Sequence, residues 1–459
     1  MRVAWLGAAL AAVVTFGTPA DAVGVNVPAP LDLHAAIRYA LAHDPTVLAD
    51  RATLAQDEAT YAKNHAAEFP SVAGSLQNQM AKTNGNNTGT FSQFGLTQAQ
   101  VFSQNTAQIA SNWTLYNGSL NQIQAQEAKR QVEQERATVR RAEQQLASDV
   151  ASAWYNAVQQ REGVRLAEGD RLYQQELLDA AQAQERVGRV AGVDVLRAQV
   201  NELRAASNLS SAQASAANAS ESLAQRIGAA PETPFALPEQ LPEPPLPTTP
   251  LDALVAVALA ARPDIAGARA QIAYARLTDS AIDTDRRPQI TLNGAFGHSE
   301  VPAQTQMPGF PTINPESAGF WQIGANTTLT IPFIEYGARR AAHAAARAQI
   351  DSAVASLESA QNGVEVSVRQ ALRGAQTAAA NLAYAREADQ LGAESARIEQ
   401  LRYRNGLSSI TDVTSAEQTA LQSAQDLVTA RVNYLDALTA LRVAVGAADP
   451  LDIAVTGGP

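Results

Sequence analysis

The chain has no cysteine among its 459 residues, and it lacks the common sequence motifs of enzymes and metal sites. Without cysteine it forms no disulfide, no thiolate metal site, no sulfur nucleophile and no lipid anchor on an N-terminal cysteine. H-E-x-x-H, G-x-S-x-G, Walker A and dinucleotide-binding fingerprints are all absent. Five histidines occur without the spacing of metal ligands: His34, His43, His65, His298 and His343. We therefore predict no enzymatic activity, no cofactor and no metal centre.

Positive charge is also scarce. The chain has 34 Lys and Arg residues against 45 Asp and Glu residues, which gives a formal net charge of −11. Binding to nucleic-acid phosphates requires clustered basic side chains. The composition therefore argues against a nucleic-acid partner.

Long apolar runs are missing except near the N-terminus, at residues 3–16. Arg2 precedes this run, and the small-x-small sequence Ala20-Asp21-Ala22 follows it, which predicts a signal peptide over residues 1–22. An uncleaved anchor is the alternative, but the run is shorter than the ~20 residues of a membrane helix. The mature chain is thus either exported and soluble, or it crosses a membrane as β-strands.

Five landmarks in the first half of the chain return 218 residues later. They are the pairs Pro45 and Pro263, Pro70 and Pro288, Gly188 and Gly406, Asp194 and Asp412, and Gly228 and Gly446. A constant offset predicts two structural repeats, at residues 23–230 and 251–448, with a short disordered tail at 449–459. Residues 231–250 join them and contain eight prolines, so this linker is expected to be extended and stiff. Two unrelated helical domains with coincidental glycines are the alternative.

Each repeat predicts the same order of elements, namely a broken helix, a strand pair and a long helix hairpin. The strand pairs fall at about 71–116 and 289–333, and the hairpins at about 119–228 and 338–446. Residues 120–186 contain no proline and are rich in alanine, which favours a helix about 100 Å long. Small side chains let such helices pack closely as coiled coils.

The strand around Trp321 shows the clearest alternation, with apolar residues at odd positions from 321 to 331 and polar residues between them. The apolar face fits either lipid or the core of a soluble sheet, and the strand alone does not decide between them. Four aromatic residues are candidates for membrane-interface anchors or for core positions: Trp113, Phe320, Trp321 and Phe333.

Four strands are too few to close a barrel, which needs about eight. An open sheet in a membrane would leave backbone groups unpaired in hydrocarbon, which is not tolerated. If the strands span a membrane, several copies must share one barrel. The helix pairs would then continue as a hollow cylinder.

At this point the chain resembles the outer membrane efflux proteins of the TolC type, over essentially its whole mature length. The motifs that carry the resemblance are ALAHDP with EFPSV, WTLYNG with IPFIEYG, and the helix turns RVGRVAGVDVLRAQ and RYRNGLSSITDVTSAE. The resemblance implies an α+β membrane protein, a homotrimer with a twelve-stranded β-barrel in the outer membrane and an α-helical tunnel in the periplasm. It would be the exit duct of a tripartite efflux pump or a type I secretion system.

The resemblance also implies partners. A periplasmic adaptor (membrane fusion) protein would contact the hairpin tips at Gly188 and Gly406, and an inner-membrane RND or ABC-type transporter would supply the energy. Outer membrane lipid would surround the barrel.

A periplasmic gate is implied as well. Asp194 and Tyr403 match positions that link the second tip to the first, and Asp412 matches an acidic ring. Ser408 replaces a linking arginine and Ser415 a second ring aspartate. This departure predicts a looser gate that binds cations less.

Arg404 is the candidate substitute for the missing arginine link. Simpler roles remain open for the other gate positions: Asp194 and Asp412 as helix caps, and Tyr403 as ordinary helix packing. For the whole chain, the alternatives are a soluble periplasmic coiled-coil adaptor, a structural surface fibre and an exported enzyme.

Overall fold

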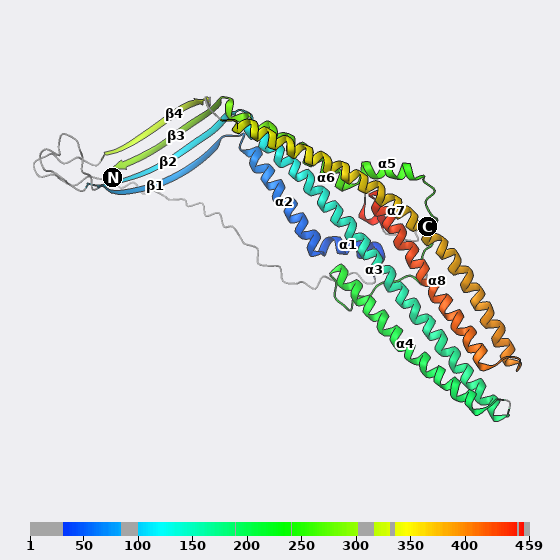
Figure 1. Cartoon of the computed structure of the whole chain (residues 1–459). Coiled ribbons are helices and arrows are strands. Elements are labelled where there is room, and N and C mark those ends of the chain that lie inside the picture. The colour runs from blue at the N-terminus through cyan, green and yellow to red at the C-terminus, as the bar shows by residue number, and fades with distance from the viewer. Residues whose placement is uncertain are drawn as a thin grey trace, which may run out of the picture.

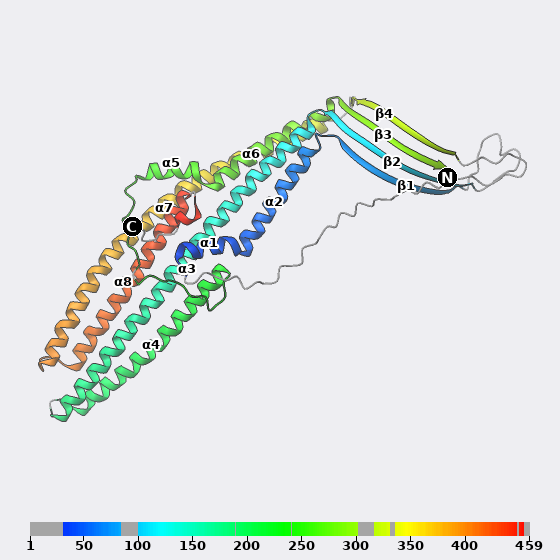
Figure 2. The ribbon, with the colours of Figure 1, turned by 180° about the vertical axis from the view of Figure 1, so that it is seen from behind.

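The computed structural model describes residues 31–83, 100–188, 190–239, 241–301, 316–330, 336–447 and 449–453. The molecule is elongated, with a sheet at one end and helices that run away from it (Figures 1 and 2). At the far end the helices form two hairpins, one of α3 and α4 and one of α7 and α8.

The element order repeats along the chain. The first half contains α1 (Leu33–His43), α2 (Pro45–Ala66), β1 (Ser71–Thr83), β2 (Gln100–Asn117), α3 (Leu120–Arg186) and α4 (Gly192–Ile227). The second contains α5 (Leu251–Ala261), α6 (Pro263–Ala281), η2 (Thr284–Arg286), β3 (Gln289–Val301), β4 (Glu316–Thr328), α7 (Ala338–Arg404) and α8 (Ile410–Val445). For α3 and α7, both 338 − 120 and 404 − 186 give 218, the offset found in the sequence.

Short polar residues fix the helix starts in the first repeat. The Asp32 carboxylate accepts a hydrogen bond of 2.6 Å from the Ala35 amide at the start of α1. Asp44 accepts bonds from the first amides of α2, and Pro45 occupies the first helical position, where no amide is needed.

Two consecutive residues with positive φ precede each long helix. They are Gly118 and Ser119 before α3, and Tyr336 and Gly337 before α7. Each repeat therefore has one glycine in this turn, at different places. Gly337 is the equivalent of Ser119, and not of Gly118 as the sequence comparison suggested.

The four strands form one antiparallel sheet in the order β1-β2-β3-β4. The β2–β3 pairing joins the two repeats, since it sets Ile109 opposite Phe296 and Trp113 opposite Leu292. β1 and β4 lie at the edges, each with a neighbour on one side only among the described strands.

The main core lies halfway along the helices, where α1, α3, α4 and α8 meet. Its largest fully buried side chains include Ile37, Tyr155, Leu223 and Leu435. No helix in the ranges given above has both the length and the apolar composition needed to cross a membrane.

The proline-rich linker is extended and carries no helix in its described residues. The C-terminal residues differ from the prediction of a disordered tail. Residues Pro450–Ile453 form a 3-10 helix, η3, and the Asp452 carbonyl accepts a hydrogen bond of 2.8 Å from Arg442 of α8. Residues 454–459 lie outside the described part of the chain.

Arg262 ties the second repeat to the end of α8. Its guanidinium is 9% exposed, pairs with Asp264 at 2.7 Å, and donates to the Ala444 carbonyl at the C-terminal end of α8. The equivalent position in the first repeat is Asp44, 218 residues earlier, so a capping carboxylate and a buried cation occupy equivalent places.

We predict that Arg262→Ala destabilises the folded chain by about 3 kcal/mol, because it leaves a partly buried carboxylate and a helix-end carbonyl without their cation. The free energy of unfolding from denaturant titration measures this loss. Arg369→Ala is the matched control, because Arg369 forms an exposed pair with Glu365 four residues away and should change stability by less than about 1 kcal/mol.

Candidate functional site

One face of the sheet is apolar across all four strands. Directly paired residues of antiparallel strands share a face, and Gly74, Ile109, Phe296 and Trp321 form one such row. The large apolar side chains on this face are Val72, Leu76, Ile109, Trp113, Leu292, Phe296, Trp321 and Ile323. Leu76 is 88% exposed, and Trp321 and Ile323 are each 75% exposed. An exposed apolar patch of this kind marks a surface that another apolar phase covers.

The opposite face of the sheet is polar. It contains Gln77, Gln108, Asn112, Asn293, Gln322 and Asn326. Phe320 also lies on this face, opposite Gly297, whose missing side chain leaves room for the ring. Phe320 and Trp321 therefore point to different sides of the sheet, and Phe333 lies outside the described residues.

The apolar band has a limited height. Along β3 it runs from Ile290 to His298, a length of about 26 Å at ~3.3 Å per residue. In the next row the same face carries the polar pair Asn78 and Asn105, joined by a hydrogen bond of 2.6 Å. A strand tilt of about 40° would reduce the band to about 20 Å, close to the ~25 Å band of outer-membrane barrels.

Trp113 lies at the helix-proximal end of this face. Its indole Nε1 donates a hydrogen bond of 3.0 Å to the Glu68 carbonyl, while about a third of the residue stays exposed. An apolar ring with a satisfied polar edge suits the boundary between lipid and water.

The two hairpin turns form the other end of the molecule. Gly188 and Gly406 adopt φ of 71° and 73°, and no heavy atom would lie near a Cβ on either glycine. Both residues are exposed. The turns are therefore open to contact from outside the chain.

Tyr403 connects the two hairpins. It is 5% exposed and packs in a cluster with Leu177, Leu178 and Ala181 of α3, Ala198 of α4, and Ile410 and Val413 of α8. Its hydroxyl has no hydrogen-bond partner among the described residues. Burial raises the pKa of the Tyr403 phenol, and the charge of Asp194 adds to the rise.

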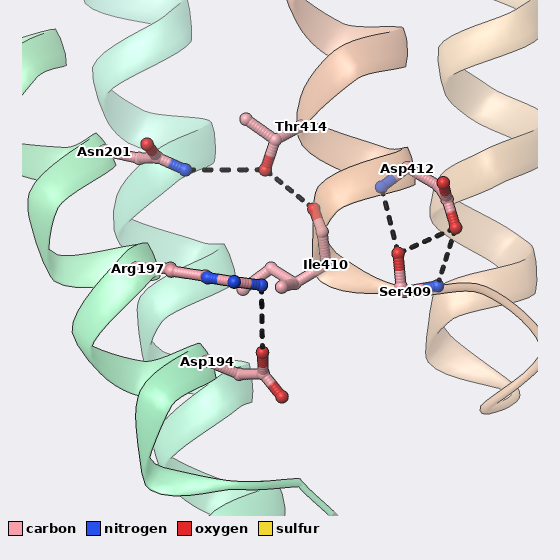
Figure 3. Close-up of polar contacts among 7 residues, drawn as sticks. All are labelled: Asp194, Arg197, Asn201, Ser409, Ile410, Asp412 and Thr414. Atoms are coloured by element: carbon pink, nitrogen blue, oxygen red, sulfur yellow. Dashed lines mark hydrogen bonds and ion pairs between the residues drawn. The ribbon is translucent and has the colours of Figure 1, made fainter.

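Asp194 and Asp412 lie on different helices and have different partners (Figure 3). Asp194 makes no cap bond and lies 3.8 Å from Arg197, one turn further along α4. Asp412 forms a capping box with Ser409, since its carboxylate accepts from the Ser409 amide at 3.1 Å and from the hydroxyl at 2.7 Å. These bonds hold the pKa of the Asp412 carboxyl below its usual range. Asp412 therefore caps α8, one of the two roles considered from the sequence.

The remaining predicted positions lie near the same turns. Arg404 is exposed, and its charge acts on the phenol of Tyr173 in α3. Ser408 donates a hydrogen bond of 2.7 Å to Glu399 of α7. Ser415 is exposed beside α4, where Asn201 donates a hydrogen bond of 3.5 Å to Thr414.

Three buried polar residues near the turns were missed by the sequence analysis. The Tyr173 hydroxyl and the Gln174 carbonyl oxygen are buried without partners among the described residues. Glu417 of α8 has a raised pKa because it is buried, and because Asp170 adds a like charge. The spacing of Glu417 four residues after buried Val413 is a signal that could have placed it on the packed face.

We predict a pH dependence from Asp436, which accepts a hydrogen bond of 2.7 Å from Ser152 across α3 and α8. Burial raises the pKa of this carboxyl, so the folded state binds its proton more tightly than the unfolded state does. Its contribution to stability is therefore larger at low pH and is lost as pH rises through the folded-state pKa. Asp436→Asn should raise the unfolding temperature at pH 8 and flatten its decline between pH 5 and pH 8. Asp426→Asn, an exposed position on the same helix, should leave the profile unchanged.

Comparison with known proteins follows this geometry. The family model described as "Outer membrane efflux protein" matches residues 36–229 and 254–447, and both 254 − 36 and 447 − 229 give 218. No curated protein matches the sequence significantly.

Several solved structures share the fold. The open-state MtrE outer membrane channel of Neisseria gonorrhoeae is 20% identical, with TM-score 0.69 over 91% of this chain and 89% of that chain. The CmeC channel of Campylobacter jejuni is 17% identical, with TM-score 0.70 over 91% and 86%. VceC of Vibrio cholerae is 18% identical, with TM-score 0.66 over 90% and 96%. Because the family model covers most of the sequence, the chain belongs to the outer membrane efflux protein family, as a TolC-type channel of the outer membrane with its tunnel in the periplasm.

Proposed function

We propose that three copies of the chain form a twelve-stranded barrel and a helical tunnel that is the exit duct of a tripartite efflux pump or a type I secretion system. The observation that carries the proposal is the four-stranded sheet with an exposed apolar face and two unpaired edges. Hydrocarbon tolerates no unpaired edge, and four strands close no barrel. Pairing β4 of one copy with β1 of the next satisfies both edges.

The helices support a ring as well. In α4, Ala198 and Ala205 are buried, while Val193, Leu196, Val200 and Leu203 are exposed. At about 3.6 residues per turn these four side chains form a stripe on the opposite side of the helix. We call it the α4 stripe.

A second stripe runs along α7, where Tyr384, Leu391 and Ile398 repeat every seven residues on the side away from buried Leu382 and Ala375. We call it the α7 stripe. Its levels match those of the α4 stripe, since 196 − 188 and 406 − 398 both give 8, and 203 − 188 and 406 − 391 both give 15. Seven-residue spacing is typical of helices that pack as coiled coils, so the α4 stripe of one copy fits the α7 stripe of the next.

The proposed gate is at the two turns. Tyr403 and Asp194 would hold the second hairpin against the first, and Arg404 would add a cation near Tyr173. Asp412 would present three carboxylates at one level in the trimer while it caps α8. The buried, unpaired Tyr403 hydroxyl supports a closed state that is readily released.

Opening requires a partner, because the chain has no motif for using an energy source. A periplasmic adaptor that contacts Gly188 and Gly406 would favour the open state by binding it more tightly. An inner-membrane transporter, of RND or ABC type, would choose and drive the cargo. A soluble periplasmic adaptor is the weaker candidate, because such a protein needs no exposed apolar sheet face.

The assembly is testable by cross-linking, since the chain has no native cysteine. Leu203→Cys with Leu391→Cys should give covalent dimers and trimers in the outer membrane fraction under mild oxidation. Leu172→Cys with Leu391→Cys is the control, because Leu172 is exposed on α3 outside the α4 stripe. A soluble monomer, or equal cross-linking in both pairs, would contradict the proposed ring.

The duct function is testable by conductance. The purified protein should form ion-conducting channels in planar lipid bilayers, and Asp194→Ala and Tyr403→Phe should each raise the resting conductance several-fold by weakening the link between hairpins. Asp179→Ala in α3, an exposed position near the same level, should conduct as the wild type does. Absence of any conductance from a folded, membrane-inserted protein would refute the function.

A further inference from the structure

The proline-rich linker contacts both hairpins at mid-height. We call residues 231–250 the strap. On the side of the first hairpin, Arg161 of α3 donates a hydrogen bond of 2.8 Å to the Leu237 carbonyl and a second to the Pro238 carbonyl. Further support comes from Phe235, whose ring meets Trp154 of α3 edge to face. The first half of the strap is thereby attached to α3.

The second half of the strap is attached to α7 and α8 through one carboxylate. Glu243 accepts a hydrogen bond of 2.6 Å from Nε of Arg431 in α8, and its other oxygen pairs with Arg386 of α7. The next residue, Pro244, accepts a hydrogen bond of 2.6 Å at its carbonyl from the Tyr434 hydroxyl of α8. A single side chain therefore holds the two helices of the second hairpin together.

These contacts lie at one height above the turns. Arg161 precedes Gly188 by 27 residues, Arg386 precedes Gly406 by 20, and Arg431 follows Gly406 by 25. At ~1.5 Å per residue this is about 30–40 Å from the tips. Beyond this level the two hairpins extend as separate pairs of helices (Figure 1).

The strap is well suited to transmit tension. Its prolines restrict the backbone and keep it extended, so it stretches little and loses little entropy when it binds. Each ion pair of Glu243 is partly exposed and is weak by itself. A contact of this kind holds a position at rest and yields to a modest force.

We propose that the strap is a clasp between the hairpins, in which Glu243 sets the resting position of α7 and α8 against α3 and is released when the tunnel opens. This inference rests on the proposed function, because it assumes that the tips separate. The direct α3–α8 bonds at the same height, Ser152 to Asp436 and Gln159 to Thr429, remain in place. They provide the pivot, while the clasp limits rotation about it.

The test compares Glu243→Gln with Glu239→Gln, which lies on the same strap and has no ion pair among the described residues. Glu243→Gln should raise the resting conductance in planar bilayers by roughly three- to five-fold, as expected for the loss of two partly exposed ion pairs. Glu239→Gln should not change it. Arg386→Gln should act like Glu243→Gln, and it should add little in the double variant, because the clasp is already released.

A second readout is independent of conductance. Spin labels at Ala183→Cys in α3 and Ala393→Cys in α7, both exposed, report the distance between the hairpins in the purified trimer. Glu243→Gln should shift this distribution to longer distances. If the wild type conducts and Glu243→Gln leaves both conductance and distances unchanged, the clasp is wrong. If no variant conducts but Glu243→Gln lengthens the distances, the clasp stands and the proposed duct fails.

Discussion

The unpaired edges of the four-stranded sheet are the constraint on which the rest of this structure depends. Backbone groups at a strand edge need partners, and water cannot supply them beside an apolar face that is covered by lipid. The edges lie on β1 and β4, the first and last strands of the two repeats, so each copy carries both halves of the missing contact. A closed ring of copies is the arrangement that satisfies all of them at once.

The helices are built for the same ring. Their buried residues are mostly alanine and valine, which permits close packing of long helices without a wide core. The apolar stripes on α4 and α7 lie on the outer sides of the two hairpins, while polar and charged residues cover much of the remaining surface. Sheet and helices thus leave apolar surface open on both flanks of the chain.

Duplication set the architecture, and divergence provided the functional asymmetry. The helices keep an offset of 218 residues, yet Asp44 caps a helix where Arg262 forms a buried ion pair. The two turns differ in the same way. Asp194 pairs with Arg197, whereas its equivalent Asp412 forms a capping box. Only the second hairpin places a tyrosine, Tyr403, into the contact between the hairpins.

The sequence by itself determined the repeats, the long helices and the strands, because these follow from local periodicity, proline positions and the constant offset. It also placed the caps at Asp32 and Asp44, since capping acts within three residues. Only the tertiary structure decided that Phe320 lies on the polar face, that Glu417 is buried, and that Glu243 binds Arg386 and Arg431. These outcomes depend on sheet pairing and helix rotation between residues far apart in the chain, and local spacing carries no information about such contacts.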